Sequence, residues 1–190
     1  MSFLPTDYSI PAKDSSYMKF IEGKNQFRVL DSAIVGFELW VGGKPVRRKG
    51  ANEFTSNQLA NADTNTFTGK KKTPQYFWAF PVFNYQTEKV EILEVRQVTI
   101  MRGMEDYLRD DDYGKDPKKY DFVVVRDEAG EKVEYRVNVK PPKELDEGIL
   151  KLYKDLNINL NALFTGADPF AGEKLDVDEI DEKLKVFSKK

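Results

Sequence analysis

Residues 75–85, QYFWAFPVFNY, constrain the fold more than any other segment, because they place aromatic rings on both faces of one expected strand. Side chains alternate between the two faces of a strand. This alternation puts Tyr76, Trp78 and Phe80 on one face, and Phe77, Ala79 and Phe83 on the other. Only one face can line a single core. We therefore expect the surplus rings either to form a binding surface or to be covered by another part of the chain.

Short apolar runs separated by turn signals predict further strands. We expect a long or bent first strand over residues 27–41, a hairpin of 75–85 with 90–95, and a final hairpin of 120–126 with 132–139. Over residues 97–109 the apolar side chains recur at three- and four-residue spacing, which predicts a helix. This order is typical of the OB-fold, a partly open barrel. The predicted class is mainly β: a five-stranded OB-fold Greek-key barrel with one helix between strands 3 and 4.

The sequence has segments before and after the predicted barrel and one long connection within it. Residues 1–16 are rich in turn formers and predict an N-terminal arm, and residues 17–142 hold the OB-fold domain. Residues 42–74 are polar and rich in Gly, Asn and Thr, and so long a connection favours a functional loop. Residues 143–190 form a C-terminal extension that we expect to be partly helical and acidic.

Two residues predict local irregularities in the strands. Gly36 interrupts an apolar run and indicates a bulge or a bend. Pro81 has no backbone N–H to donate, and therefore indicates a bulge or a strand at the edge of a sheet.

The composition excludes many kinds of chemistry. The chain has no Cys and no His, which removes disulfides, thiol nucleophiles, zinc sites built on these ligands and the usual general base. No apolar run approaches the roughly 20 residues of a membrane-spanning helix, and the N-terminus does not resemble a signal peptide. Although the net charge is only -2, Lys and Arg are in excess over residues 1–90, and Asp and Glu over residues 91–190.

Aromatic and basic residues occur side by side in the first half of the chain. We expect stacking on unpaired bases by four rings, namely Trp40, Tyr76, Trp78 and Phe80. We expect contacts to phosphates from two clusters in the predicted loop, namely Lys44, Arg47, Arg48 and Lys49, and Lys70, Lys71 and Lys72. The competing interpretations are a core with two covered faces for the rings and a solvated loop for the lysines and arginines.

The acidic residues offer two further interpretations. Asp110, Asp111, Asp112 and Asp116 lack the spacing of a calcium loop, and we interpret them as a solvated helix end, with no metal or cofactor predicted. The run near the C-terminus is either a charged amphipathic helix or an acidic segment that competes for the basic surface and binds partner proteins. The residues predicted to bind partners are Asp178, Glu179, Asp181, Glu182 and Phe187.

Three segments carry a resemblance to a known family: YMKFIEGKNQFRVLDSAIVGFELW followed by KPVR, then FWAFPVFNYQTEKVEILEVRQVTI, then KKYDFVVVRDEAGEKVEYRV. Over roughly residues 3–145 the chain resembles the single-stranded DNA-binding proteins of tailed bacteriophages. The resemblance implies an OB-fold that coats single-stranded DNA without sequence preference. It also implies DNA contacts at Trp40, Lys44, Arg47, Tyr76, Trp78 and Phe80. The residues after Phe187 depart from the terminal aromatic residue found in many such proteins.

These observations predict a non-catalytic, single-stranded DNA-binding protein for phage DNA replication and recombination, in the cytoplasm of an infected bacterium. Expected partners are single-stranded DNA and, through the acidic segment, a phage or host polymerase, helicase or recombinase, with a homo-oligomer left open. The alternative is an OB-fold adaptor of a phage replisome with little affinity for DNA. An enzyme would require carboxylate-bound Mg²⁺, and no pair of acidic residues is placed for it.

Overall fold

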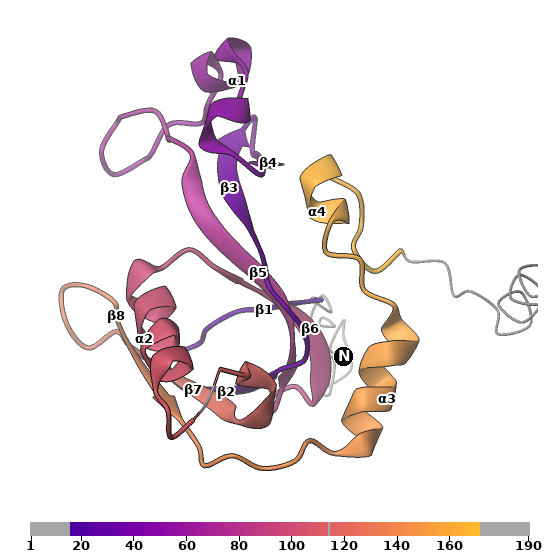
Figure 1. Ribbon diagram of the computed structural model, residues 1–190. Coiled ribbons are helices and arrows are strands. Elements are labelled where there is room, and N and C mark those ends of the chain that lie inside the picture. The colour runs from indigo at the N-terminus through magenta and orange to yellow at the C-terminus, as the bar shows by residue number, and fades with distance from the viewer. Residues whose placement is uncertain (1–15, 114, 172–190) are drawn as a thin grey trace, which may run out of the picture.

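The computed structural model describes residues 16–113 and 115–171, and their architecture is mainly β, as the sequence predicts (Figure 1). The strands are β1 (Tyr17–Met18), β2 (Gly23–Val29), β3 (Ile34–Val41), β4 (Lys44–Arg48), β5 (Gln75–Asn84), β6 (Lys89–Val95), β7 (Asp121–Asp127) and β8 (Glu134–Val139). The helices are α1 (Ser56–Ala60), α2 (Val98–Arg109), α3 (Glu147–Leu156) and α4 (Ala162–Thr165), with 3₁₀ turns η1 (Ala51–Glu53) and η2 (Pro117–Lys119).

All eight described strands belong to one mixed sheet, which is three strands more than predicted. Its hydrogen-bonded order is β1-β6-β5-β2-β7-β8, and β3 pairs with both β4 and β5. The path is open, because the strands at its two ends, β1 and β8, do not pair with each other within the described part of the chain. The predicted first strand is divided into β2 and β3, and β1 adds a short parallel pairing to β6.

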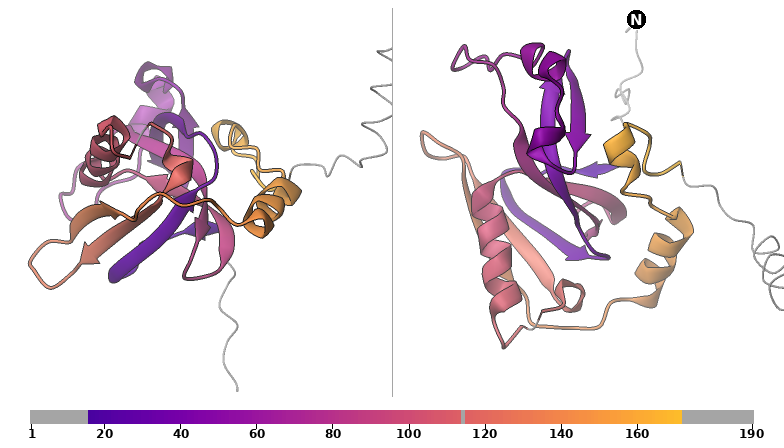
Figure 2. Two further views of the ribbon diagram at one scale, coloured as in Figure 1. Left: turned by 60° about the horizontal axis from the view of Figure 1, so that its bottom comes forward. Right: turned by 45° about the horizontal axis from the view of Figure 1, so that its top comes forward.

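The predicted long loop contains ordered elements, which corrects the expectation of a polar connection over residues 42–74. Gly42 and Gly43 have φ angles of 60° and 74°, which suits the tight turn of a two-residue hairpin and returns the chain as β4. Thr55 and Gln58 form a reciprocal capping box at the start of α1. Both signals are local and visible in the sequence. The projecting β3–β4 hairpin, α1 and the loop to β5 are called the arm below (Figures 1 and 2).

The main core lies on one face of β5. Phe80 and Val82 are 2% and 0% exposed and pack against α2 through Ile100, Met101 and Met104. Trp78 is half-buried against the same cluster. Helix α2 can approach the sheet closely because Gly103 has no side chain: a Cβ there would lie 2.7 Å from a methyl carbon of Val137.

The second face of β5 is covered by the C-terminal extension. Phe77 packs in a cluster with Leu163 of α4, and Phe83 packs in another cluster beside the apolar side of α3. Helices α3 and α4 accordingly lie along one side of the sheet in Figure 1. For Phe77 and Phe83, the interpretation as a core with two covered faces is therefore the correct one.

Gly36 and Pro81 have other roles than the predicted bulge, bend or edge position. Gly36 is in regular register with Phe77, and its lack of a side chain makes room for Phe164, whose ring would lie 2.8 Å from a Cβ at this position. Pro81 lies inside the sheet, not at an edge, opposite the break between β2 and β3, and its carbonyl accepts a hydrogen bond from the Leu30 N–H at 3.0 Å.

Candidate functional site

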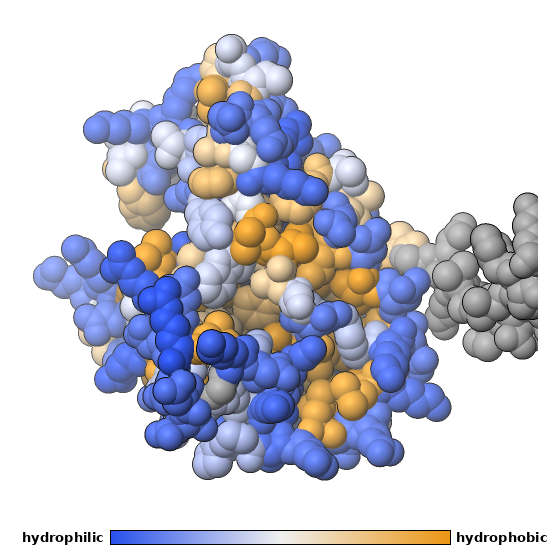
Figure 3. All heavy atoms as spheres, in the orientation of Figure 1, coloured by the Kyte–Doolittle hydropathy of each residue, from blue (hydrophilic) through white to orange (hydrophobic). Residues whose placement is uncertain are grey.

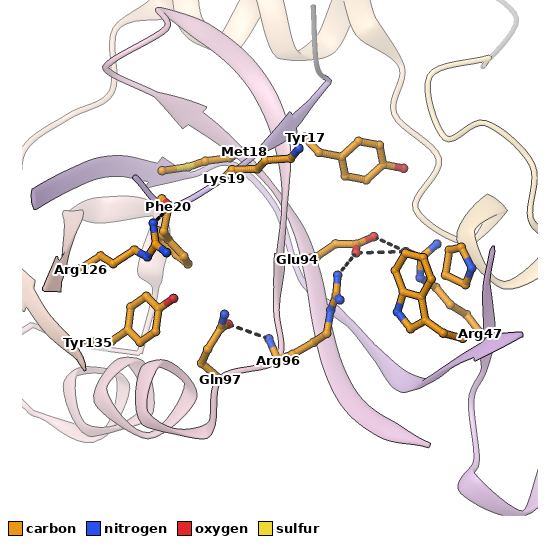
Figure 4. A pocket seen from close by; sticks show the side chains of 12 residues that line it. Tyr17, Met18, Lys19, Phe20, Arg47, Glu94, Arg96, Gln97, Arg126 and Tyr135 are labelled. Atoms are coloured by element: carbon orange, nitrogen blue, oxygen red, sulfur yellow. Dashed lines mark hydrogen bonds and ion pairs between the residues drawn. The ribbon is translucent and has the colours of Figure 1, made fainter. Parts of the chain in front are cut away.

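A cleft of about 640 Å³ lies between the β3–β4 hairpin and the β7–β8 hairpin. Four aromatic side chains contribute to it from widely separated segments, namely Tyr17, Phe20, Trp40 and Tyr135. Four positively charged side chains also line it, namely Lys19, Arg47, Arg96 and Arg126, and the carboxylate of Glu94 lies among them. Figure 4 shows two ends: Phe20, Arg126 and Tyr135 at one, and Arg47 with Glu94 at the other.

Two arginines and two glutamates form a salt-bridge network at one end of the cleft, which we call the quartet: Glu38, Arg47, Glu94 and Arg96. Arg47 Nη2 lies 2.9 Å from Glu38 Oε2 and 2.8 Å from Glu94 Oε1. Arg96 reaches the same two carboxylates at 3.2 and 3.1 Å. The quartet carries no net charge, so its arginines do not add a positive potential to the cleft.

Strand register brings the quartet together. Glu38 is paired with Arg47 across β3 and β4, and cross-strand partners share a face of the sheet. The Glu38 side chain is 1% exposed, and a buried carboxylate without partners is costly. Arg47 also lies over the Phe77 ring, 5.7 Å from its centroid. These contacts hold the guanidinium of Arg47 in one place.

Trp40 is fixed by the quartet and by a lysine. Its indole Nε1–H donates to Glu38 Oε1 at 2.9 Å, and Lys72 Nζ lies 5.2 Å from the centroid of its ring. An ammonium group over an indole is an attractive cation–π arrangement. Trp40 therefore enters the cleft wall in a defined orientation, as a preorganised flat apolar surface.

The opposite end of the cleft is a second aromatic group. Phe20 and Tyr135 meet edge to face with their centroids 6.1 Å apart. Arg126 donates from Nη1 to the Phe20 carbonyl oxygen at 3.3 Å and pairs with Glu128. Arg126 Nε is buried and has no hydrogen-bond partner among the described residues.

Tyr17 lies at the border between the cleft and the C-terminal extension, since it also packs beside Leu163 and Phe77. Burial, and then the negative charge of Glu94, raise the pKa of the Tyr17 phenol above its ordinary value.

Two of the predicted site residues, Trp40 and Arg47, line the cleft, and a third, Lys72, lies over the Trp40 ring. The other predicted basic residues lie around the arm. Lys49 lies over the Phe164 ring at 5.9 Å, Arg48 donates to the Arg47 carbonyl, and Lys71 donates to the Ala60 carbonyl. Lys44 and Lys70 are exposed and make no ion pair with a described residue.

The three predicted rings of β5 lie away from the cleft. Phe80 is buried in the main core, which removes it from the rings that a ligand could reach, and Trp78 packs against the same cluster. Tyr76 is 43% exposed but pairs with Phe37, on the opposite face of the arm from Glu38 and Arg47. The cause is the pairing of β5 with β3, which sets the face that each ring occupies.

Sequence reasoning missed several residues of the cleft, namely Tyr17, Lys19, Phe20, Glu94 and Tyr135. They stand in three separate segments and carry no motif, so only their spatial convergence identifies them. Arg96 directly follows the predicted strand 90–95 and Arg126 ends the predicted strand 120–126, which is only a weak signal in the sequence. The predicted partner-binding residues Asp178, Glu179, Asp181, Glu182 and Phe187 lie outside the described residues.

Figure 3 shows an apolar area in the middle of one face of the molecule, surrounded by hydrophilic residues.

Over residues 16–113 and 115–171, no group of three or more acidic side chains could hold a metal ion. Within those same ranges no helix is long and apolar enough to cross a membrane. The cleft itself combines aromatic side chains with the paired charges of the quartet, and Lys72 lies over the Trp40 ring.

Comparisons with protein-family models, with curated proteins and with solved structures find no match to this chain.

Proposed function

We propose that this chain is a non-catalytic protein that binds single-stranded DNA in the cleft, without preference for sequence. Unpaired bases stack on Trp40 and on the rings at the other end of the cleft, while lysines outside the quartet contact the phosphates. Replication and recombination of phage DNA inside an infected bacterium are the processes that the family resemblance implies.

The strand connections support an OB-fold with additions. The divided first strand, β2 with β3, pairs with β5 and β7. Helix α2 follows β6 and precedes β7, and β8 completes a hairpin with β7. With β1 and β4 set aside as additions, this order matches that of an OB-fold, in which strands 2 and 3 and the loops between strands 1 and 2 and between strands 4 and 5 bind oligonucleotides. By this comparison the β3–β4 hairpin stands for the first loop and the β7–β8 connection for the second, and the cleft lies between them.

The observation that carries the proposal is the fixed orientation of Trp40 at the cleft wall. Its hydrogen bond to Glu38 and its contact with Lys72 leave little freedom for the ring to lose on binding. Base stacking on an aromatic side chain contributes roughly 1–3 kcal/mol per base and tolerates every base. A preoriented tryptophan beside lysines therefore suits binding without sequence preference.

The absence of Cys and His supports a non-catalytic role, because most nucleophilic and acid–base mechanisms use these residues. The buried quartet does not suggest a catalytic pair, since each of its carboxylates already accepts from two arginines.

Fluorescence titration tests the proposal. The variant Trp78→Phe leaves Trp40 as the one tryptophan, and it is titrated with oligo-dT and with a matched duplex at low and moderate salt. We expect quenching by the single strand, with affinity that falls as salt rises. Absence of quenching and of binding at low salt would overturn the proposal.

An adaptor role remains the second candidate, and one observation favours it. Val35 and Tyr76 are 48% and 43% exposed on the face of the arm opposite the quartet. An apolar surface of this kind suits a protein partner. This function predicts weak DNA binding that does not depend on salt, and the same titration distinguishes the two.

A further inference from the structure

The loop between α1 and β5 is held by a dense set of hydrogen bonds. Thr64 and Lys71 form an antiparallel bridge, and the Asn65 N–H donates to the Lys70 carbonyl at 2.8 Å. The side-chain carbonyl of Asn65 accepts from the backbone N–H groups of Phe67 and Thr68 at 2.9 and 3.2 Å. This loop projects from the rest of the molecule in Figures 1 and 2.

Phe67 stands at the tip of this loop and is 98% exposed. Isolated apolar residues are common on protein surfaces, so the exposure of Phe67 by itself does not indicate a function. Here, however, the turn that presents the ring is closed by hydrogen bonds on both sides of it. Among the described residues the next most exposed large apolar side chain, Val98, is only 56% exposed. The ring is thus presented to solvent by an organised backbone.

Lysines connect Phe67 to the cleft. After Phe67 and before β5, the chain carries three consecutive lysines, Lys70, Lys71 and Lys72. The Lys72 N–H donates to the Asp63 carbonyl at 2.7 Å, and the Asp63 N–H donates to the Trp40 carbonyl at 2.8 Å. Lys72 Nζ in turn lies over the Trp40 ring. The Lys72 ammonium therefore lies at the Trp40 ring, and Lys70 stands three residues after Phe67, on the segment that runs from Phe67 to Lys72.

We propose that Phe67 is a second stacking site for the same single strand, outside the cleft. A strand that leaves Trp40 passes the ammonium groups of Lys72 and Lys70 and places a further base on Phe67. Alternation of aromatic rings with basic groups is the arrangement that binds unpaired nucleic acid. This inference rests on the proposed function and extends its footprint along the arm.

The length of the oligonucleotide separates the two sites. Affinities of wild type and Phe67→Ala are measured for oligo-dT of about 4 and about 16 nucleotides, the limits of OB-fold site sizes. We expect Phe67→Ala to weaken binding of the longer strand about 5- to 150-fold, the equivalent of one stacked base, and to leave the shorter strand unaffected. Leu59→Ala on α1, a residue 43% exposed on the same arm, is the matched control and should change neither.

A second variant reports the contact directly. Phe67→Trp, made in the Trp78→Phe background, should show additional quenching with the longer strand that is absent with the shorter one. Unchanged affinity of Phe67→Ala for the longer strand, together with no additional quenching, would overturn the inference while the function proposed for the cleft stands. If instead Trp40→Ala and Phe67→Ala both bind as the wild type does, both proposals fail.

Discussion

The indole Nε1 of Trp40 donates a hydrogen bond of 2.9 Å to Oε1 of Glu38, two residues earlier on β3. Residues two apart share a face of a strand, so a local contact sets the plane of the ring. Glu38 is itself held by Arg47 and Arg96. The orientation of a surface aromatic ring therefore depends on a buried salt-bridge network.

Replacing Trp40 by Ala should weaken the binding of oligo-dT about 5- to 150-fold, because one stacked base is worth roughly 1–3 kcal/mol. Tyr76→Ala is the matched variant on the opposite face of the arm and should bind as the wild type does. Binding is measured by anisotropy of a labelled oligonucleotide, and circular dichroism checks that both variants fold. Loss of affinity in Tyr76→Ala but not in Trp40→Ala would show that the binding site has been assigned to the wrong face.

The salt dependence of binding should separate the lysines from the quartet. Lys70 is exposed and makes no ion pair with a described residue, so Lys70→Gln should reduce the slope of log K against log salt by about 0.7, the value for one phosphate contact on a single strand. The double variant Arg47→Gln with Glu94→Gln removes one charge of each sign from the quartet. We expect its affinity to fall and its slope to stay unchanged. A reduced slope in the double variant would mean that Arg47 contacts a phosphate.

A second buried salt bridge should dominate stability. Arg28 Nε and Asp121 Oδ1 are 2.6 Å apart with both side chains 0% exposed, and Arg28 Nη1 donates to the carbonyls of Lys118 and Lys143. Asp121→Asn leaves the guanidinium buried without its counter-charge, which should lower the free energy of unfolding by about 3–5 kcal/mol.

Urea denaturation measures this loss, with Glu105→Gln as control. Glu105 pairs with Arg109 on the surface of α2 at 3.5 Å, and such a pair contributes about 0.3–0.5 kcal/mol. Similar losses in Asp121→Asn and Glu105→Gln would contradict the assignment of Arg28 and Asp121 as a structural pair.

Stability should decline at alkaline pH. Burial, and then a hydrogen bond to Asp121, raise the pKa of Tyr85 to about 12. The folded protein therefore retains a proton that the unfolded chain, with a tyrosine pKa near 10, releases. The contribution of Tyr85 is complete below pH 10 and is lost as the pH rises toward 12. Urea midpoints of wild type and Tyr85→Phe between pH 9 and 12 should converge, and a constant difference would contradict this linkage.

Most elements of the fold were predictable because their signals are local. Helix α2 begins and ends within a residue of the segment that its periodicity indicates, and β5, β6, β7 and β8 lie within two residues of their predicted positions. The hairpin at Gly42 and Gly43 and the capping box of α1 are also present as local patterns, but the polar composition of residues 42–74 predicts a loop. The position of Pro81 inside the sheet was not predictable, since it depends on the break between β2 and β3, which lie elsewhere in the chain.

The sequence by itself determined that the chain is mainly β, that one helix separates two hairpins, and that aromatic rings outnumber the positions on one core face. Only the tertiary structure decided which rings are covered. Phe77 and Phe80 are of one residue type, three positions apart, and each is buried by a different partner: the first by α4, whose residues follow more than eighty positions later, and the second by α2. In the same way, Glu38, Arg47, Glu94 and Arg96 become a neutral network because strand pairing brings three segments to one face. Alternation is a property of a single strand, whereas burial and ion pairing depend on what the rest of the chain places opposite it.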